Sequence, residues 1–177
     1  MPRVSLAIDN CFAMKRWTDP DEWMGIVREL GLCFVEASAD NEIDPLFSTG
    51  AFLHRWLSRT RAASKKHGVR VANLYSGHGT YSTLGLAHDD PSVRRHIRED
   101  WIKAMMRFAS RLGAGLGFFA HAFSERVLSD PDRYENAYTT LVKDLRNLSQ
   151  YGEELGLGYW GLEQMYSPHQ VPWTIQG

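Results

Sequence analysis

The alternation of short apolar runs with longer helical segments limits the possible folds of this chain more than any other feature of the sequence. Five apolar runs, each too short for a helix, alternate with four segments whose apolar residues recur at helical spacing. The runs cover residues 4–8, 32–37, 69–74, 116–120 and 159–162, and the helical stripes lie within residues 23–30, 53–63, 93–112 and 134–148. Strands that alternate with helices in this way predict an α/β fold with a parallel sheet and right-handed crossovers.

Asp-Pro pairs and glycines mark where the helices begin and end. The pairs at 19–20, 90–91 and 130–131 each offer an N-cap side chain followed by a proline at the first helical position. Each of the later apolar runs follows a glycine that can close a helix in the left-handed conformation; these are Gly31, Gly68, Gly113 and Gly156. No linker rich in Pro or Ser divides the chain, so we expect residues 1–177 to form a single domain.

Two parallel architectures fit this pattern. A doubly wound sheet that holds a dinucleotide would show a Gly-rich turn directly after its first strand, but residues 9–13 read Asp-Asn-Cys-Phe-Ala. A (β/α)8 barrel needs eight units and about 250 residues, so this chain would supply its first five strands and four helices. The repeat length of about 40 residues is compatible with either architecture.

Composition narrows the class of protein. The 177 residues are 44% hydrophobic and carry a formal net charge of -1, which suits a globular domain and gives no general field to attract nucleic acid. No apolar run approaches the roughly 20 residues of a membrane span, and the N-terminus lacks the apolar core of a signal peptide. Cys11 and Cys33 show neither metal-site spacing nor a disulfide framework. We therefore expect a cytoplasmic protein without nucleic-acid or membrane partners.

Polar side chains gather directly after the predicted strands. They include Asp9, Asn10, Glu36, Asn73, Tyr75, His78, His121, Glu125, Glu163, His169 and Trp173. Because the carboxyl ends of parallel strands meet at one edge of a sheet, these histidines and carboxylates are expected to share that edge. The opposite edge is expected to carry mostly helix C-termini with basic side chains such as Lys65, Lys66 and Arg111. This difference between the two edges predicts an enzyme.

These residues differ in how strongly each indicates a functional rather than a structural role. Glu36 and Glu163 end apolar strands, where a carboxylate is costly unless it is paired or bound to a metal, so a functional role is favoured. His78 either holds its Gly-rich loop or contacts a substrate or metal, and His121 is either a buried structural histidine or a ligand. Trp17 fits core or lid packing and equally an aromatic wall beside a sugar.

Several strings resemble a known family. Ile8-Asp-Asn-Cys-Phe-Ala, Val35-Glu-Ala-Ser-Ala, Ala72-Asn-Leu-Tyr-Ser-Gly-His-Gly and Leu162-Glu-Gln-Met-Tyr are similar to segments of the sugar phosphate isomerase/epimerase family, the xylose-isomerase-like TIM barrels. The strings at residues 74–81, 115–121 and 167–174 resemble the tetrulose-phosphate epimerases of erythritol breakdown. The resemblance implies a partial (β/α)8 TIM barrel that acts on a small-molecule sugar or sugar phosphate.

The resemblance also implies a metal site and a reaction. Its members hold a divalent ion (Mn, Mg, Co or Zn) with Glu, Asp, His and Glu side chains from the fifth to eighth strands, and Glu163 matches the first of these. Glu163 would then be both metal ligand and catalytic base, removing a proton next to a ketose carbonyl while the ion stabilises the enediolate. The resemblance further implies substrate-binding roles for side chains around the rim: Trp17, Glu36, His78, His121 and His169.

The chain departs from the family where it stops, at Gly177. Strands six to eight and three of the implied ligands have no counterpart, so we expect an N-terminal barrel portion, truncated after strand five, that is inactive alone and self-associates through open strand edges. Two other interpretations stay open. Histidines after strands three and four with a glutamate after strand five also match a zinc-dependent, apurinic endonuclease-like nuclease, and a non-catalytic barrel fragment would need no site.

Overall fold

The computed structural model describes residues 4–76 and 83–174 and shows one parallel sheet of five strands. The strands are β1 (Ala7–Asp9), β2 (Phe34–Ser38), β3 (Arg70–Tyr75), β4 (Gly115–Phe118) and β5 (Trp160–Leu162). Each strand pairs in parallel with its neighbours in sequence, in the order β1-β2-β3-β4-β5. A doubly wound sheet would reverse direction at a switch point. The uninterrupted order is that of a barrel section, as the second of the two predicted architectures requires.

Helices connect the strands in the predicted places. They are η1 (Asn10–Ala13), α1 (Pro20–Glu29), η2 (Ala39–Ile43), α2 (Gly50–His67), α3 (Pro91–His96), η3 (Ile97–Ile102), α4 (Lys103–Leu112), α5 (Glu125–Leu128) and α6 (Pro131–Glu154). The four predicted apolar stripes lie in α1, in α2, in the continuous run from α3 to α4, and in α6. The short helix α5 was not predicted, because four residues are too few to show a helical period.

The predicted helix caps are present. Asp19, Asp90 and Asp130 each accept a hydrogen bond from the backbone N–H two residues later, at 3.0, 2.7 and 3.0 Å. The four terminator glycines have φ between 64° and 78°, the left-handed conformation that ends a helix without steric cost only at glycine. Local sequence therefore sets the length of each crossover helix, and this places the strand ends that follow.

The run from α3 to α4 contains a π-helical segment, η3. Its wider turn inserts a residue into the helix, and such turns are frequent near functional sites. The segment buries Trp101 and Ile102, which are 3% and 1% exposed. Arg98 of η3 also donates to the buried carboxylate of Asp144 on α6. The π turn thereby ties the third crossover helix to the fourth.

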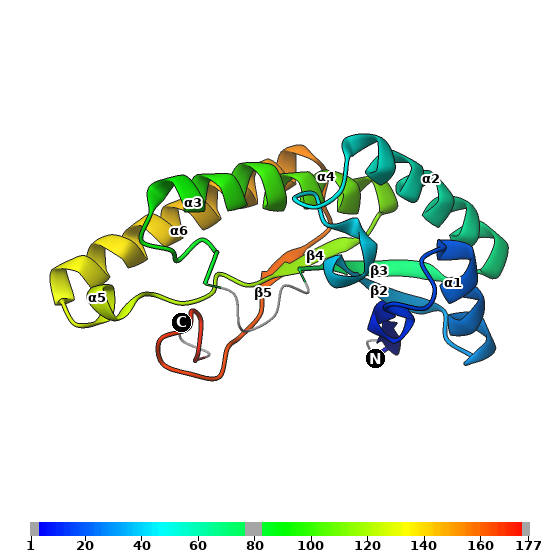
Figure 1. Ribbon diagram of the computed structural model, residues 1–177, viewed down its shortest axis with the longest axis horizontal. Helices are drawn as coiled ribbons and strands as arrows, with labels where there is room; N and C mark the ends of the chain where they lie inside the picture. Colours follow the sequence, from blue (N-terminus) through cyan, green and yellow to red (C-terminus); the bar gives the residue numbers. More distant parts are fainter. Residues whose placement is uncertain (1–3, 77–82, 175–177) are drawn as a thin grey trace.

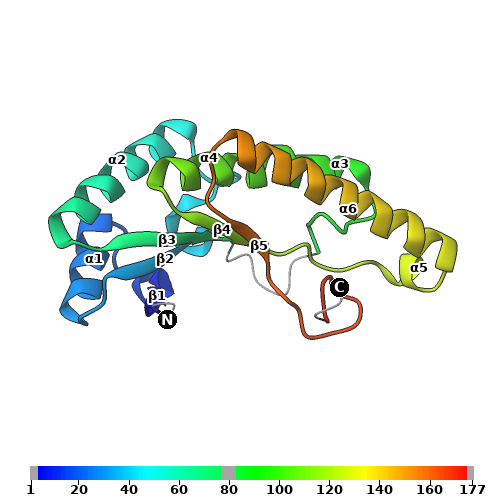
Figure 2. The same cartoon turned by 180° about the vertical axis from the view of Figure 1, so that it is seen from behind.

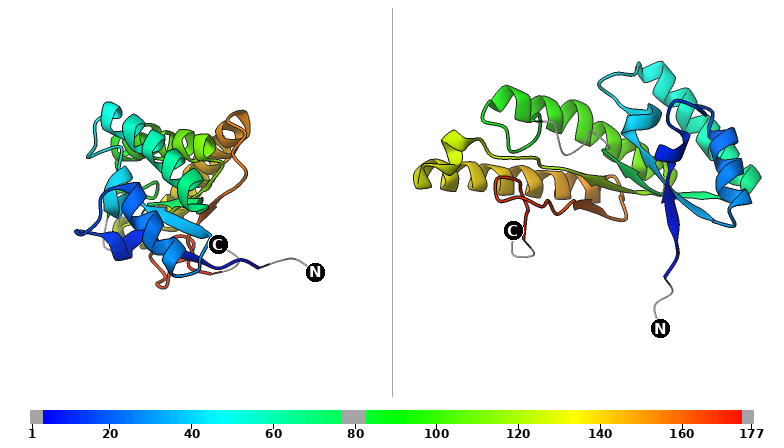
Figure 3. Two further views of the ribbon diagram at one scale, coloured as in Figure 1. Left: turned by 90° about the vertical axis from the view of Figure 1, so that its right-hand side faces the viewer. Right: turned by 60° about the horizontal axis from the view of Figure 1, so that its bottom comes forward.

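The hydrophobic core lies between the helices and one face of the sheet. Figures 1 and 2 show α2, α4 and α6 together on that face, and the end-on view in Figure 3 agrees. In β2 the alternate residues Val35 and Ala37 point into this core and are fully buried, whereas Phe34 and Glu36 on the opposite face are half-buried. No helix in the described ranges is long and apolar enough to cross a membrane. The opposite face of the sheet carries polar residues, among them Glu36.

Candidate active site

Two glycines in β4 open a gap on the polar face of the sheet. Gly117 lies between Tyr75 of β3 and Gly161 of β5 in the register of the sheet. A Cβ atom at Gly117 would lie 3.2 Å from the ring of Tyr75. Because this position has no side chain, the Tyr75 ring lies across β4, and its hydroxyl donates a hydrogen bond to Oε2 of Glu163. The last residue of β3 is thus joined to the carboxylate that follows β5.

A second tyrosine crosses the same strand in the opposite direction. Tyr159 precedes β5, and its hydroxyl donates to the carbonyl oxygen of Ala72 in β3 at 2.8 Å. A Cβ atom at Gly115 would lie 2.2 Å from the Tyr159 ring, so only glycine permits this approach. The alternate positions Gly115 and Gly117 of β4 therefore leave space for two rings that span three strands.

Glu36 holds a second carboxylate beside this pair. The side-chain amide of Asn73 donates to Oε2 of Glu36 at 2.6 Å. Burial raises the pKa of Glu36, the charges of Asp9 and Glu163 raise it further, and the hydrogen bond from Asn73 acts in the opposite direction. The carboxylates of Asp9, at the end of β1, and Glu163, just after β5, are therefore close enough to act on the ionisation of Glu36 in β2.

Tyr75 is held in its neutral, hydrogen-donating form. Burial is the main cause that raises its pKa, and the hydrogen bond to Glu163 and the nearby carboxylate charges add to the effect. The Glu163 side chain is exposed, and its backbone N–H donates to the carbonyl of Phe118 at 3.1 Å. The sheet thus holds the backbone of Glu163 and the Tyr75 phenol holds its carboxylate, which stays open to a ligand.

His121 follows β4 in a tightly packed position. It is 6% exposed and has φ of 65°, which is uncommon outside glycine. A Cβ atom at Gly85 would lie 2.5 Å from its ring, and the ring of Phe119 lies 5.5 Å away on centroids. The backbone carbonyl of His121 also accepts a hydrogen bond from Val171 at 2.9 Å. The structure therefore places His121 in a buried setting, and its role as a substrate ligand stays a prediction.

A family model described as Xylose isomerase-like TIM barrel matches residues 24–173, which include β2 to β5 and Glu163. The chain belongs to this family. The match confirms the family named from the sequence strings, whereas it does not address the narrower resemblance to tetrulose-phosphate epimerases. A comparison with curated proteins found no match.

Solved structures share the fold of this xylose isomerase-like chain. A candidate xylose isomerase from Rhodospirillum rubrum superposes with a TM-score of 0.85 at 22% identity, over 96% of this chain and 57% of that one. The apo 3-keto-D-glucoside 4-epimerase of E. coli gives 0.67 at 16% identity, over 95% and 58%. The D-psicose 3-epimerase of Clostridium cellulolyticum with D-tagatose gives 0.64 at 15% identity, over 88% and 51%. The chain therefore spans between half and three fifths of the length of these proteins.

The metal site implied by the resemblance is not complete in the described part of this xylose isomerase-like barrel. Among residues 4–76 and 83–174, no group of three or more His, Cys, Asp or Glu side chains is placed to hold a metal ion. Glu163 is present at the rim with one oxygen engaged by Tyr75. A single carboxylate does not fit a divalent ion by itself, since such ions take several ligands.

The other predicted site residues are not brought together with Glu163. Trp17 is half-buried against the core, with the guanidinium of Arg16 6.0 Å from its ring centroid. His169 is exposed, and its Nε2 lies 3.4 Å from Oγ of Ser167. His78 lies outside the described residues. The substrate-binding roles of Trp17 and His169 stay predictions, because in the described ranges no hydrogen bond or ring contact connects either residue to Glu163.

Glu42 in η2 is expected to make the free energy of unfolding depend on pH. Burial raises its pKa to about 7, opposed by a hydrogen bond from Thr18. Between the unfolded value of 4.5 and about 7, the folded chain binds a proton that the unfolded chain releases, so the free energy of unfolding falls as pH rises through this window. Glu42→Gln is expected to remove the fall and, since the group is partly exposed, to raise the free energy of unfolding at pH 8 by about 1–2 kcal/mol.

Urea unfolding at pH 5 and pH 8 measures this difference. Glu135→Gln on the exposed side of α6 is the matched control and should show the wild-type dependence on pH. An unchanged pH dependence in the Glu42→Gln variant would show that Glu42 ionises normally in the folded chain.

Proposed function

We propose that this chain carries the first half of a sugar isomerase or epimerase site in which Glu163 moves a proton next to a ketose carbonyl. The observation that supports this most is the Tyr75–Glu163 pair at the carboxyl end of β5, for which Gly117 of β4 leaves room. Ligand sites of parallel βα barrels lie at that end of the strands. Solved structures of the same fold include the 3-keto-D-glucoside 4-epimerase and D-psicose 3-epimerases.

The side chains present divide the chemistry between them. The exposed Glu163 carboxylate takes the proton from the carbon beside the carbonyl, and the electron pair moves to the carbonyl oxygen. Return of a proton to the opposite face of that carbon inverts it, and return to the neighbouring carbon gives the isomer. The Tyr75 phenol orients the carboxylate. Glu36, whose pKa is raised by burial, and the amide of Asn73 offer hydrogen-bonding groups to substrate hydroxyls.

We extend the proposal to the cofactor and the setting. Glu163 would supply one ligand to a divalent ion, and the other ligands would come from outside the described residues. The substrate would be a sugar or sugar phosphate. The strands β1 and β5 form the two edges of the sheet, so a second copy could pair there. Cys11 and Cys33 are exposed, free thiols, which suits a cytoplasmic location.

Exchange of substrate hydrogen with solvent tests the proposed chemistry directly. The 177-residue chain is incubated in D2O with a panel of ketoses and ketose phosphates, with Mn, Mg, Co or Zn added, and proton NMR follows the signal beside the carbonyl. Loss of that signal for at least one sugar, without net conversion to the epimer or isomer, is the expected result, because the partial barrel supplies the base but not the group that returns the proton to the opposite face. Exchange with no member of the panel, at enzyme concentrations equal to substrate, would overturn the proposal and leave the non-catalytic fragment as the interpretation.

A further inference from the structure

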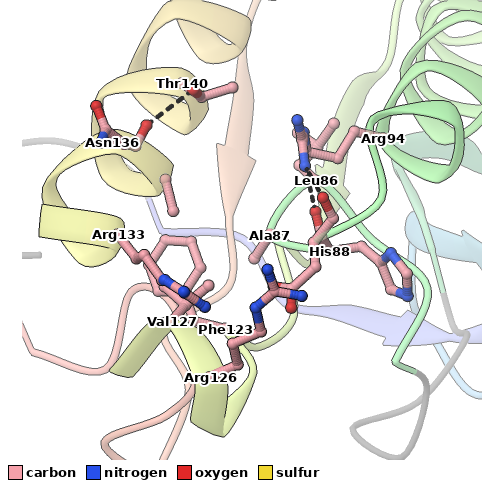
Figure 4. Close-up of a pocket in the computed structure, with 12 residues that line it drawn as sticks. Leu86, Ala87, His88, Arg94, Phe123, Arg126, Val127, Arg133, Asn136 and Thr140 are labelled. Atoms are coloured by element: carbon pink, nitrogen blue, oxygen red, sulfur yellow. Dashed lines mark hydrogen bonds between the residues drawn. The ribbon is translucent and has the colours of Figure 1, made fainter. Parts of the chain in front are cut away.

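A cleft separate from the rim site lies between the start of α3 and the turn that joins α5 to α6. Its volume is about 410 Å³, and Figure 4 shows side chains that reach it from both sides. Three segments line it: residues 86–94, 123–127 and 133–140. None of Tyr75, Glu36 and Glu163 is among the lining residues. The cleft therefore needs an explanation of its own.

Three arginines from three helices line this cleft: Arg94 from α3, Arg126 from α5 and Arg133 from α6. Arg94 donates to the carbonyl oxygens of His88 at 2.5 Å and Asp89 at 2.8 Å. Neutral acceptors hold its guanidinium in place, so its charge is not cancelled. Arg126 is exposed and makes no hydrogen bond or ion pair with the described residues. At least two positive charges are thus available to a ligand.

The acidic groups nearby do not cancel this charge. Asp89 is the one carboxylate among the lining residues, and it accepts a hydrogen bond from the hydroxyl of Ser124 at 2.6 Å. Arg133 pairs with Asp130 at 3.0 Å, but both side chains are more than 40% exposed, and exposed pairs of this kind are weak. Three guanidinium groups against one lining carboxylate leave a positive cleft.

The back of the cleft is apolar. Leu86, Ala87, Phe123 and Val127 line it and are all at least 92% buried. Low-dielectric walls strengthen the field of the arginines within the cleft. The volume falls in the range of small-molecule sites and exceeds what an inorganic anion needs. A ligand that fits therefore has an anionic group and a short carbon skeleton.

We propose that this cleft binds the phosphate group of a small organophosphate. A phosphate monoester presents three terminal oxygens, and guanidinium groups from three directions can each reach one, whereas a carboxylate offers only two oxygens in one plane. Arg94 is held in place by the loop before α3, and the exposed Arg126 would turn its guanidinium toward the ligand. The site stands apart from the proposed proton transfer at Glu163.

Calorimetric titration of the 177-residue chain with glycerol 3-phosphate at low salt tests the site. Arg126→Gln is expected to weaken binding by at least about tenfold, since a charged hydrogen bond is lost. Arg146→Gln, an exposed arginine elsewhere on α6, is the matched control and should bind as the wild type does. Circular dichroism of both variants checks that the fold is retained.

Comparison of glycerol 3-phosphate with other anions identifies the chemical class of the ligand. Inorganic phosphate should displace glycerol 3-phosphate, and glycerate, which has a carboxylate in place of the phosphate, should bind at least about tenfold more weakly. Equal binding by Arg126→Gln, equal binding of glycerate, or no heat at millimolar ligand would each overturn the proposal. Glu163→Gln should bind glycerol 3-phosphate normally, so failure of the proton-transfer proposal would leave this result untouched.

Discussion

Glu163→Gln is expected to lower kcat for proton exchange at the ketose by about a thousandfold, within the range found for loss of a general base. The amide keeps the size of the side chain and can still accept a hydrogen bond from Tyr75, but it cannot take a proton. KM should change by less than about threefold, because the loss falls on the transition state rather than on ground-state binding. Initial rates of deuterium incorporation into the best sugar of the panel measure both constants.

Two further variants test whether the loss of rate is specific to the carboxylate of Glu163. Glu135→Gln removes an exposed carboxylate from α6, away from the rim, and should retain wild-type rates. Tyr75→Phe removes the hydroxyl that orients Glu163 and should lower kcat by a smaller factor, about tenfold. If Glu163→Gln turned over at the wild-type rate, another group would be the base, and Glu163 would be left with a structural role.

Phe118→Ala is expected to lower the free energy of unfolding by about 3–5 kcal/mol, the usual cost of removing a buried phenylalanine. Phe118 is 1% exposed, and its ring stacks on Trp160 with centroids 5.7 Å apart and planes 18° apart. The variant loses this contact and leaves a cavity in the core beside β4 and Trp160. Because the carbonyl of Phe118 accepts from the N–H of Glu163, the end of β5 should loosen as well.

Urea unfolding followed by circular dichroism measures the effect. Tyr166→Ala removes an aromatic side chain that is 71% exposed and should change the free energy by no more than about 0.5 kcal/mol. Phe118→Leu, which refills much of the volume, should recover more than half of the loss. A change below about 1 kcal/mol in Phe118→Ala would mean that β5 does not depend on this stack.

The sequence predicted the strands because their limits are set by local chemistry. Four of the five apolar runs follow a left-handed glycine, and the three Asp-Pro pairs cap the helices as predicted. The first strand begins at Ala7 rather than at Val4, since Val4 and Leu6 are 95% and 73% exposed and have no neighbouring strand to pair with in the described chain. No glycine marks the start of that strand, so its boundary depended on hydrophobicity alone.

The contacts of the site were harder to predict, because they depend on the register between strands. Glu163 and Glu36 were both predicted to follow strands; Glu163 does, whereas Glu36 lies within β2, which continues to Ser38. The link from Tyr75 to Glu163 requires Gly117 to lie beside Tyr75 and Gly161 beside Gly117 in the sheet. A signal was present: Asn73 and Tyr75 are two residues apart and so share a strand face. The alternate glycines of β4 indicate that something large crosses that face.

The arginine cleft could not be predicted from the sequence at all. Arg94, Arg126 and Arg133 lie on separate helices, and each has the ordinary spacing of a solvated surface residue. Their convergence depends on how the third and fourth crossover helices pack together. That packing includes the ion pair between Arg98 and the buried Asp144, which no local pattern reveals.

The π turn at Ile97–Ile102 also sets the rotation of α3 about the helix axis relative to α4. Residues C-terminal to it, such as Met105 and Ala109, are anchored in the core, whereas Arg94 on its N-terminal side faces the cleft. The π turn takes up one extra residue locally, whereas in unbroken α-helical winding that residue would rotate α3 by about 100° relative to α4. Rewinding the turn as α-helix without removing a residue would therefore turn Arg94 away from the carbonyls of His88 and Asp89. The π turn thus keeps the cleft's fixed cation in place while Met105 and Ala109 stay in the core.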